Sequence, residues 1–202
     1  MNERFQPGLE WPATTQAADG MPRRPWTIAE IEAMVAAGII DEDERFELIG
    51  GEVVPMSPKG ARHEMVKIEL NRHLQRLGLD QLTIAQETTL RLGDTAFLEP
   101  DFCVFPRSIM PGDMRGHDVL LAIEIADTSL RYDLGRKIGV YAAYGIAEVW
   151  GVDAVTLVTH VHRSLGAEGY RVRREAGPDE QILAGRAEGV SMCLSALGLK
   201  PL

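Results

Sequence analysis

Two carboxylates occur at positions where burying a charge is costly. Glu124 lies within residues 119–125, a run that is apolar on both faces and predicts a central strand of a covered sheet. Asp101 opens a second apolar run, residues 102–105, directly after a proline that suits the first position of a strand. If these strands are neighbours, the carboxylates meet at their ends, and a cation between them is the simplest way to keep both ionised. Two or three oxygen ligands with open positions suit a hard divalent metal such as Mg²⁺ or Mn²⁺.

Lys137 is the third residue that could belong to this site. It flanks the apolar stripe of a helix predicted from Asp133 to about Tyr144, and its long stem can reach across the surface that faces the sheet. Asp133 and Lys137 are also an i, i+4 pair, so an ordinary surface salt bridge is an equally direct interpretation. The two acids upstream are what make Lys137 a candidate.

His63 begins the apolar stripe of a helix that follows Pro58 and Gly60 and is predicted to end before Gly78. Because this stripe packs on the sheet, His63 points inward or towards the edge of the sheet, whereas Glu64 is rotated away from it. Two interpretations remain open. His63 is either a satisfied structural histidine or a residue in or beside the site.

The other elements alternate between helices and strands. Thr27 and Glu30 form a capping box at the start of a short helix that ends at Gly38. Residues 45–49 and 52–56 predict a hairpin about two glycines, and this hairpin carries Glu47. Further strands are predicted at residues 82–92, 96–105, 118–126, 147–152, 155–162 and 168–174.

Length and composition favour one folded domain. The chain has 202 residues, 45% of them apolar, and no long polar linker, so we expect a flexible arm over residues 1–25 and a single domain over residues 26–202. The two cysteines, Cys103 and Cys193, are interpreted as buried free thiols. No run approaches the roughly 18 to 20 apolar residues of a membrane span, and no secretory signal is recognised, so we expect a cytoplasmic protein.

The net charge of −9 argues against strong non-specific attraction to nucleic acid. It does not exclude a DNA partner, because a bound metal would neutralise part of the acidic cluster. Four basic residues of the second helix can also line one local surface, although a solvated helix face is the interpretation we favour for most of them. They are Arg62, Lys67, Arg72 and Arg76.

The order of the elements resembles the core of the PD-(D/E)XK nuclease superfamily. Within it, the sequence is most similar to the Uma-two family of predicted restriction endonucleases, over about residues 45–153. The matching residues are Phe46-Glu-Leu-Ile-Gly-Gly-Glu-Val-Val54, Met56-Ser-Pro58, His63, Glu99-Pro-Asp101, Ile123-Glu-Ile-Ala-Asp-Thr-Ser129, Tyr132-Asp133, Lys137, Tyr141, Gly145-Ile146, Glu148-Val-Trp150 and Asp153.

This resemblance implies an α/β fold with a mixed, strongly bent sheet flanked by helices, extended by the hairpin and the late strands. It also implies hydrolysis of DNA phosphodiesters by a divalent metal, Mg²⁺ or Mn²⁺. By the same resemblance, Asp101, Glu124 and the backbone carbonyl of Ile125 are expected to hold this metal.

The sequence departs from the superfamily pattern at one position. The superfamily usually has a lysine two residues after the strand glutamate, but this chain has Ala126 there. Lys137 is the natural substitute, because an ammonium from the next helix could supply the same charge. Glu47 resembles the extra acid that often completes such sites, and His63 is a second candidate for that role.

Two other functions remain open. The acidic charge and the missing lysine also fit a non-catalytic protein that keeps the nuclease fold to bind a protein or nucleic acid, and hydrolysis of another phosphoester is more remote. The late strands, residues 155–174, lie outside the nuclease core. They could form a homodimer contact or an edge that the C-terminal segment covers.

Overall fold

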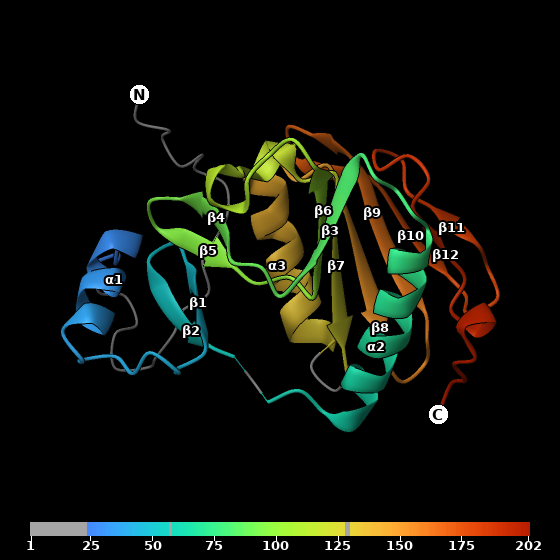
Figure 1. Ribbon diagram of the computed structural model, residues 1–202, viewed down its shortest axis with the longest axis horizontal. Helices are drawn as coiled ribbons and strands as arrows, with labels where there is room; N and C mark the ends of the chain where they lie inside the picture. Colours follow the sequence, from blue (N-terminus) through green and yellow to red (C-terminus); the bar gives the residue numbers. More distant parts are fainter. Residues whose placement is uncertain (1–23, 57, 128–129) are drawn as a thin grey trace. The chain divides into compact units, whose positions relative to one another are not determined.

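The computed structural model describes residues 24–56, 58–127 and 130–202, and the chain forms two compact units (Figure 1). The first unit is Met1–Met56 with Leu92–Leu98, and the second is Ser57–Arg91 with Glu99–Leu202. The single domain expected over residues 26–202 stays a prediction. The arm expected over residues 1–25 lies outside the described residues except at positions 24 and 25.

The first unit begins with the predicted short helix, α1 (Ile28–Ala36). Its capping box is confirmed, because Glu30 N donates to Thr27 Oγ1 over 3.2 Å and Thr27 N donates to Glu30 Oε2 over 3.0 Å. These two bonds satisfy amides that the start of a helix otherwise leaves without partners.

The predicted hairpin is also confirmed, as β1 (Phe46–Ile49) paired antiparallel with β2 (Glu52–Pro55). Gly50 and Gly51 form its turn with φ values of 61° and 81°, a region that glycine enters without steric cost. The hairpin belongs to a four-stranded sheet in the order β2-β1-β5-β4, with β4 at Leu90–Gly93 and β5 at Ala96–Leu98.

The second unit is built on a six-stranded mixed sheet in the order β10-β9-β8-β7-β6-β3. Only β7 and β8 are parallel, and α3 (Leu130–Ala143) makes the crossover that a parallel pair needs. The strands are β3 (Leu82–Gln86), β6 (Phe102–Pro106), β7 (Leu121–Ala126), β8 (Glu148–Asp153), β9 (Thr159–Gly166) and β10 (Gly169–Ala176).

Helices α2 (Ala61–Arg76) and α3 lie against opposite faces of this sheet (Figure 1). All six residues of β7 are buried, as the sequence predicted for a central strand. Ile123 and Ile125 join the core that α2 covers, whereas the intervening Glu124 contacts α3 through Tyr141. The alternation of a strand therefore directs Glu124 to the α3 face.

The prediction of two long strands at residues 82–92 and 96–105 is wrong, because each of them is broken. Residues 82–86 and 102–106 pair in the six-stranded sheet, but β4 and β5 between them belong to the other sheet. The first break falls at Glu87, whose φ of 48° takes it out of the extended region. The second break falls just before β6, at residues 99–101.

The strand predicted at residues 155–162 begins later, at Thr159. Asp153 Oδ1 accepts hydrogen bonds from Val155 N and Thr156 N, over 2.8 and 3.1 Å, and this turn displaces the strand. The chain ends with a small two-stranded sheet, β11 (Ile182–Leu183) and β12 (Ser191–Met192). Over the described residues, no helix combines the length and the apolarity of a membrane span.

Candidate active site

Asp101 and Glu124 face each other at the ends of two neighbouring strands. Phe102 pairs with Ile123 across the antiparallel β6–β7 ladder, so the residue before Phe102 lies opposite the residue after Ile123. Both side chains are buried, with 3% of Asp101 and 7% of Glu124 exposed. The sequence analysis assumed that these two strands are neighbours, and the pairing of β6 with β7 confirms it.

Asp101 has partners on both carboxylate oxygens. Oδ2 accepts a 2.7 Å hydrogen bond from Ile125 N and lies 3.1 Å from His63 Nε2, whereas Oδ1 accepts a 2.8 Å hydrogen bond from Lys59 Nζ. Burial alone would raise the pKa of Asp101, but the hydrogen bond and charge of His63 and the charge of Lys59 lower it to about 2. The carboxylate is therefore ionised at neutral pH.

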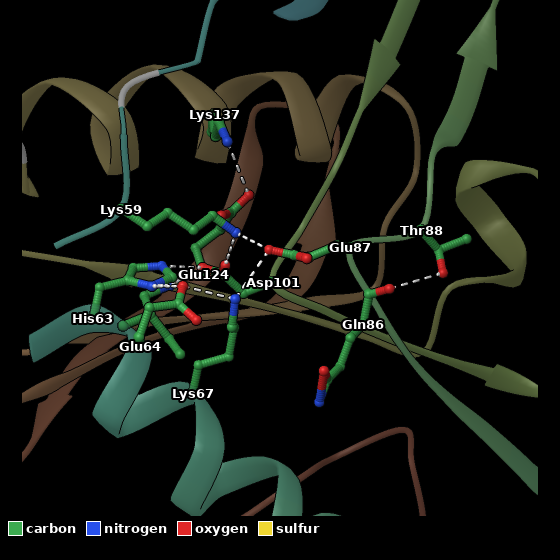
Figure 2. A network of polar contacts seen from close by, with 11 residues as sticks. Lys59, His63, Glu64, Lys67, Gln86, Glu87, Thr88, Asp101, Glu124 and Lys137 are labelled. Atoms are coloured by element: carbon green, nitrogen blue, oxygen red, sulfur yellow. Dashed lines mark hydrogen bonds and ion pairs between the residues drawn. The ribbon is translucent and has the colours of Figure 1, made fainter. Parts of the chain in front are cut away.

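Glu124 is held by two residues of α3, of which Figure 2 shows Lys137. Lys137 Nζ lies 3.3 Å from Glu124 Oε1, and the Tyr141 hydroxyl donates to the same oxygen. These two residues are one helical turn apart, so both reach the same point of the sheet. Lys137 is thus brought to the acids; the side chain of Asp133, the alternative partner, lies outside the described part of the chain.

His63 lies on the sheet-facing side of α2, where its side chain is buried beside Asp101. Its Nδ1 atom lies 3.3 Å from Glu64 Oε1, so each ring nitrogen faces a carboxylate oxygen. Glu64 itself is half exposed and accepts a 2.7 Å hydrogen bond from Lys67. Together these contacts fix the ring against Asp101.

Two further residues of the site were missed by the sequence reading, Lys59 and Glu87. Lys59 Nζ forms an ion pair with Glu87 as well as with Asp101, and Glu87 also accepts a 3.1 Å hydrogen bond from Lys67 Nζ (Figure 2). Burial lowers the pKa of Lys59, but the charges of Asp101 and Glu87 and their hydrogen bonds raise it overall. The hydrogen bond from Lys59 in turn lowers the pKa of Glu87.

The only sequence signals for these residues are weak. Lys59 lies between Pro58 and Gly60 just before α2, where loop residues often approach a site, and Glu87 is the only acidic residue of the strand predicted at residues 82–92. Lys67, which was interpreted as one of several solvated basic residues, belongs to the same group. We call the eight residues Lys59, His63, Glu64, Lys67, Glu87, Asp101, Glu124 and Lys137 the Asp101 cluster.

The donor atoms of the cluster suit a hard divalent metal. Asp101 and Glu124 supply two buried carboxylates, and lysines now balance their charge, as a metal ion could. Over the described residues, no group of three or more His, Cys, Asp or Glu side chains is arranged to hold a metal. A metal here would therefore need the backbone carbonyl of Ile125, water or substrate oxygens to complete its ligands.

Several other ionisable residues and the two cysteines are not part of the Asp101 cluster. Glu47 is buried on β1 in the first unit, and its role stays a prediction. His160 lies 3.5 Å from Glu175, and burial, with the charges of Arg173 and His160, lowers the pKa of His162 to about 4. The two cysteines are free as predicted, but only Cys103 is buried, and Cys193 is partly exposed.

The arrangement is that of a restriction-endonuclease-like nuclease fold. The chain matches the family model Uma2, described as "Putative restriction endonuclease", over residues 28–194. It therefore belongs to this family, as its motifs indicated, and the membership supports a nuclease function. No curated protein matches the chain.

Two solved structures are similar to this chain. The crystal structure of a "putative nuclease belonging to DUF820" from Anabaena variabilis ATCC 29413 has a TM-score of 0.68 and 16% identity, and the similarity covers 86% of this chain and 97% of that one. The type IIG restriction endonuclease BpuSI has a TM-score of 0.35 and 15% identity, over 54% of this chain and 13% of its own. The first similarity confirms the predicted fold class.

Proposed function

We propose that the protein is a divalent-metal-dependent endonuclease that hydrolyses DNA phosphodiester bonds. The observation that carries this proposal is the pair of buried carboxylates, Asp101 and Glu124, that face each other across β6 and β7 with lysines on both. Carboxylates are rarely buried at all, and two buried carboxylates grouped with lysines are typical of sites that handle phosphate and metal.

Asp101, Glu124 and the backbone carbonyl of Ile125 would hold the metal, Mg²⁺ or Mn²⁺. When bound, the metal supplies a water of lowered pKa and neutralises charge on the scissile phosphate. His63 and Ile125 N fix Asp101 through the oxygen Oδ2, so Oδ1, which accepts a hydrogen bond from Lys59, is the oxygen that would bind the metal.

Lys137 supplies the ammonium that Ala126 does not. Its Nζ atom lies at the Glu124 carboxylate, from which it can contact the phosphate or the attacking water. Glu47 remains a candidate for an additional acid in the site. A cytoplasmic location and a homodimer also stay predictions.

Cleavage of a supercoiled plasmid in Mg²⁺ or Mn²⁺ tests this function. Asp101→Asn and Glu124→Gln should each abolish cleavage, because each replaces an anionic ligand by a neutral amide of the same shape. Glu69→Gln is a matched control on α2, since Glu69 pairs only with Arg72 in the described contacts and lies on the exposed side of the helix. Cleavage that survives in Asp101→Asn would overturn the site assignment.

A non-catalytic nucleic-acid-binding protein of the same fold is the second candidate. It is favoured by the lysines that already neutralise both acids, Lys59 at Asp101 and Lys137 at Glu124, and by the alanine at position 126. DNA binding measured by fluorescence anisotropy distinguishes the two functions. Binding that is undiminished in Glu124→Ala, with no cleavage by the wild-type protein in either metal, would favour the second candidate.

A further inference from the structure

The two oxygens of Asp101 differ in what surrounds them. Oδ2 is occupied by Ile125 N and His63, which both belong to the buried framework of β7 and α2. Oδ1 instead accepts a 2.8 Å hydrogen bond from Lys59 Nζ. A metal ion that binds Asp101 through Oδ1 must therefore take the place of this ammonium, because two cations cannot share one oxygen without strong repulsion.

Glu87 offers Lys59 a second acceptor next to the first. Lys59 Nζ forms an ion pair with Glu87 Oε1 in the same arrangement (Figure 2). Glu87 N lies 3.4 Å from the main-chain oxygen of Asp101, so the two acids are adjacent through their backbones as well as through Lys59. An ammonium that leaves Asp101 can thus keep a carboxylate partner without crossing the site.

The backbone of Glu87 is held in an unfavourable conformation. Its φ of 48° lies in the left-handed region, which a residue with a side chain adopts only at a cost. Strand β3 ends at the residue before it, and the ladder between β3 and β6 ends there too, at the pair Gln86 and Phe102. Strain of this kind at a charged residue beside Asp101 indicates that the position of its carboxylate matters.

The exposure of the three side chains increases from Asp101 to Lys59 to Glu87, with side-chain values of 4%, 19% and 32%. A move of the Lys59 ammonium from Asp101 towards Glu87 therefore brings it closer to solvent. The same direction clears the buried oxygen Oδ1. Lys67 already contacts Glu87 Oε1 over 3.1 Å, so Glu87 is fixed in place to receive it.

We propose that Lys59 is a built-in counterion of the metal site, and that its ammonium passes from Asp101 to Glu87 when a divalent cation binds Oδ1. Lys59 and Glu87 are then positioning residues that set metal affinity. They keep Asp101 neutralised without metal and release it when metal arrives. This inference rests on the metal-binding part of the proposed function, and not on cleavage of DNA.

The affinity for Mn²⁺, measured on the full chain by electron paramagnetic resonance of the free ion, tests the proposal. Lys59→Met removes the competing cation and should tighten Mn²⁺ binding by about tenfold, the scale of effects that residues next to metal ligands have on affinity. Arg72→Met is the control. It removes a positive charge of α2 whose described partner is Glu69, outside the Asp101 cluster, so its effect should be under about threefold.

A double-mutant cycle separates the transfer of Lys59 from general electrostatics. Glu87→Gln should weaken Mn²⁺ binding by about tenfold, because Lys59 then has only Asp101 as a charged acceptor. In the Lys59→Met background the same substitution should change the affinity by less than about threefold. An equal loss in both backgrounds would show that Glu87 acts on the metal directly, and would overturn the proposal.

Two other outcomes also contradict it. Affinity that is unchanged or weaker in Lys59→Met would show that Lys59 does not compete with the metal, although the metal site itself would stand. Binding that is unchanged in Asp101→Asn would refute the metal site, and with it both the proposed function and this inference. Thermal unfolding of each variant checks folding, and Lys59→Gln replaces Lys59→Met if the latter does not fold.

Discussion

The main-chain N–H of Ile125 donates a 2.7 Å hydrogen bond to Asp101 Oδ2. The backbone directly after Glu124 therefore holds the carboxylate that faces Glu124. Because its donor is a main-chain amide, this bond does not depend on a neighbouring side chain. It fixes Oδ2 of Asp101 whether Lys59 or another cation contacts Oδ1. Hydrogen bonds from main-chain amides favour the ionised form of a carboxylate.

Acid should destabilise the protein through Asp101. Its pKa is lowered from 3.8 to about 2 in the folded chain, so its stabilisation is complete above pH 3.8 and is lost as the pH falls through about 2. The difference corresponds to about 2 kcal/mol in the free energy of unfolding. Urea denaturation of the metal-free protein between pH 6 and 2 should show this loss, and Asp101→Asn should not. An equally steep loss in the variant would contradict the assignment.

Lys137→Met should slow DNA cleavage by about 10²-fold or more, because its ammonium is the one that can stabilise charge at the Glu124 end of the site. Metal affinity should not fall, because Lys137 is not a ligand and its ammonium, like that of Lys59, repels a cation at the carboxylate it contacts. Single-turnover cleavage with saturating Mn²⁺ measures the effect. Lys200→Met, a change at an exposed residue far along the chain, is the control, and equal rates in the two variants would remove Lys137 from the site.

Tyr141→Phe should destabilise the protein by about 2 kcal/mol, because a buried, charged acceptor loses a donor. Tyr170→Phe is the matched control. Its hydroxyl donates over 2.8 Å to the neutral carbonyl of Ile146, so its loss should cost about 1 kcal/mol. Urea denaturation at pH 7 compares them. A larger loss for Tyr170→Phe would mean that Glu124 does not depend on Tyr141.

The residues of the site that lie on regular strands and helices were predictable from the pattern of buried apolar residues around them. The all-apolar pattern around Glu124 and the proline before Asp101 predicted two strands, and helical spacing made His63 and Lys137 candidates beside them. The structure pairs these strands and brings both candidates to the acids. Both patterns follow from the geometry of regular elements, in which side-chain direction depends on position alone.

Lys59 and Glu87 were not predictable by the same means. Lys59 lies in a loop without periodicity, and 42 positions separate it from Asp101. The position of Glu87 depends on its positive φ, which a glutamate rarely adopts and which the sequence does not indicate. The same residue divides the strand predicted at residues 82–92. Contacts set by loops and strained residues require the tertiary structure, because no local pattern encodes them.

His162 should give the protein a second pH dependence, in a higher range than that of Asp101. Its pKa is lowered from 6.5 to about 4 by burial and by the charges of Arg173 and His160, and Nδ1 has no hydrogen-bond partner among the described atoms. The unfolded chain takes up a proton below pH 6.5 that the folded chain refuses until about pH 4, so stability falls across this range.

His162→Phe should remove the loss between pH 6.5 and 4 while leaving the loss below pH 4. Thermal unfolding at half-unit pH intervals measures both ranges in one series. His117→Gln is the control, because 77% of the His117 side chain is exposed. An unchanged slope in His162→Phe would show that another group titrates there.

Glu148 anchors the C-terminal segment to the sheet and is fully buried. Its Oε1 accepts a 2.7 Å hydrogen bond from Trp150 Nε1, and its Oε2 accepts one of the same length from Gly185 N, in the loop between β11 and β12. In Glu148→Gln only one oxygen remains to accept, so one buried donor loses its partner. The variant should lose about 1 to 3 kcal/mol of stability.

Hydrogen exchange locates this loss. The Gly185 amide should exchange faster in Glu148→Gln than in the wild-type protein. The exchange rates of the β7 amides should change only as far as the free energy of global unfolding changes. Glu175→Gln is the control, since 71% of that side chain is exposed and its substitution should change stability by no more than about 0.5 kcal/mol. Equal losses in the two variants, or unchanged exchange at Gly185, would show that the buried carboxylate does not hold this loop.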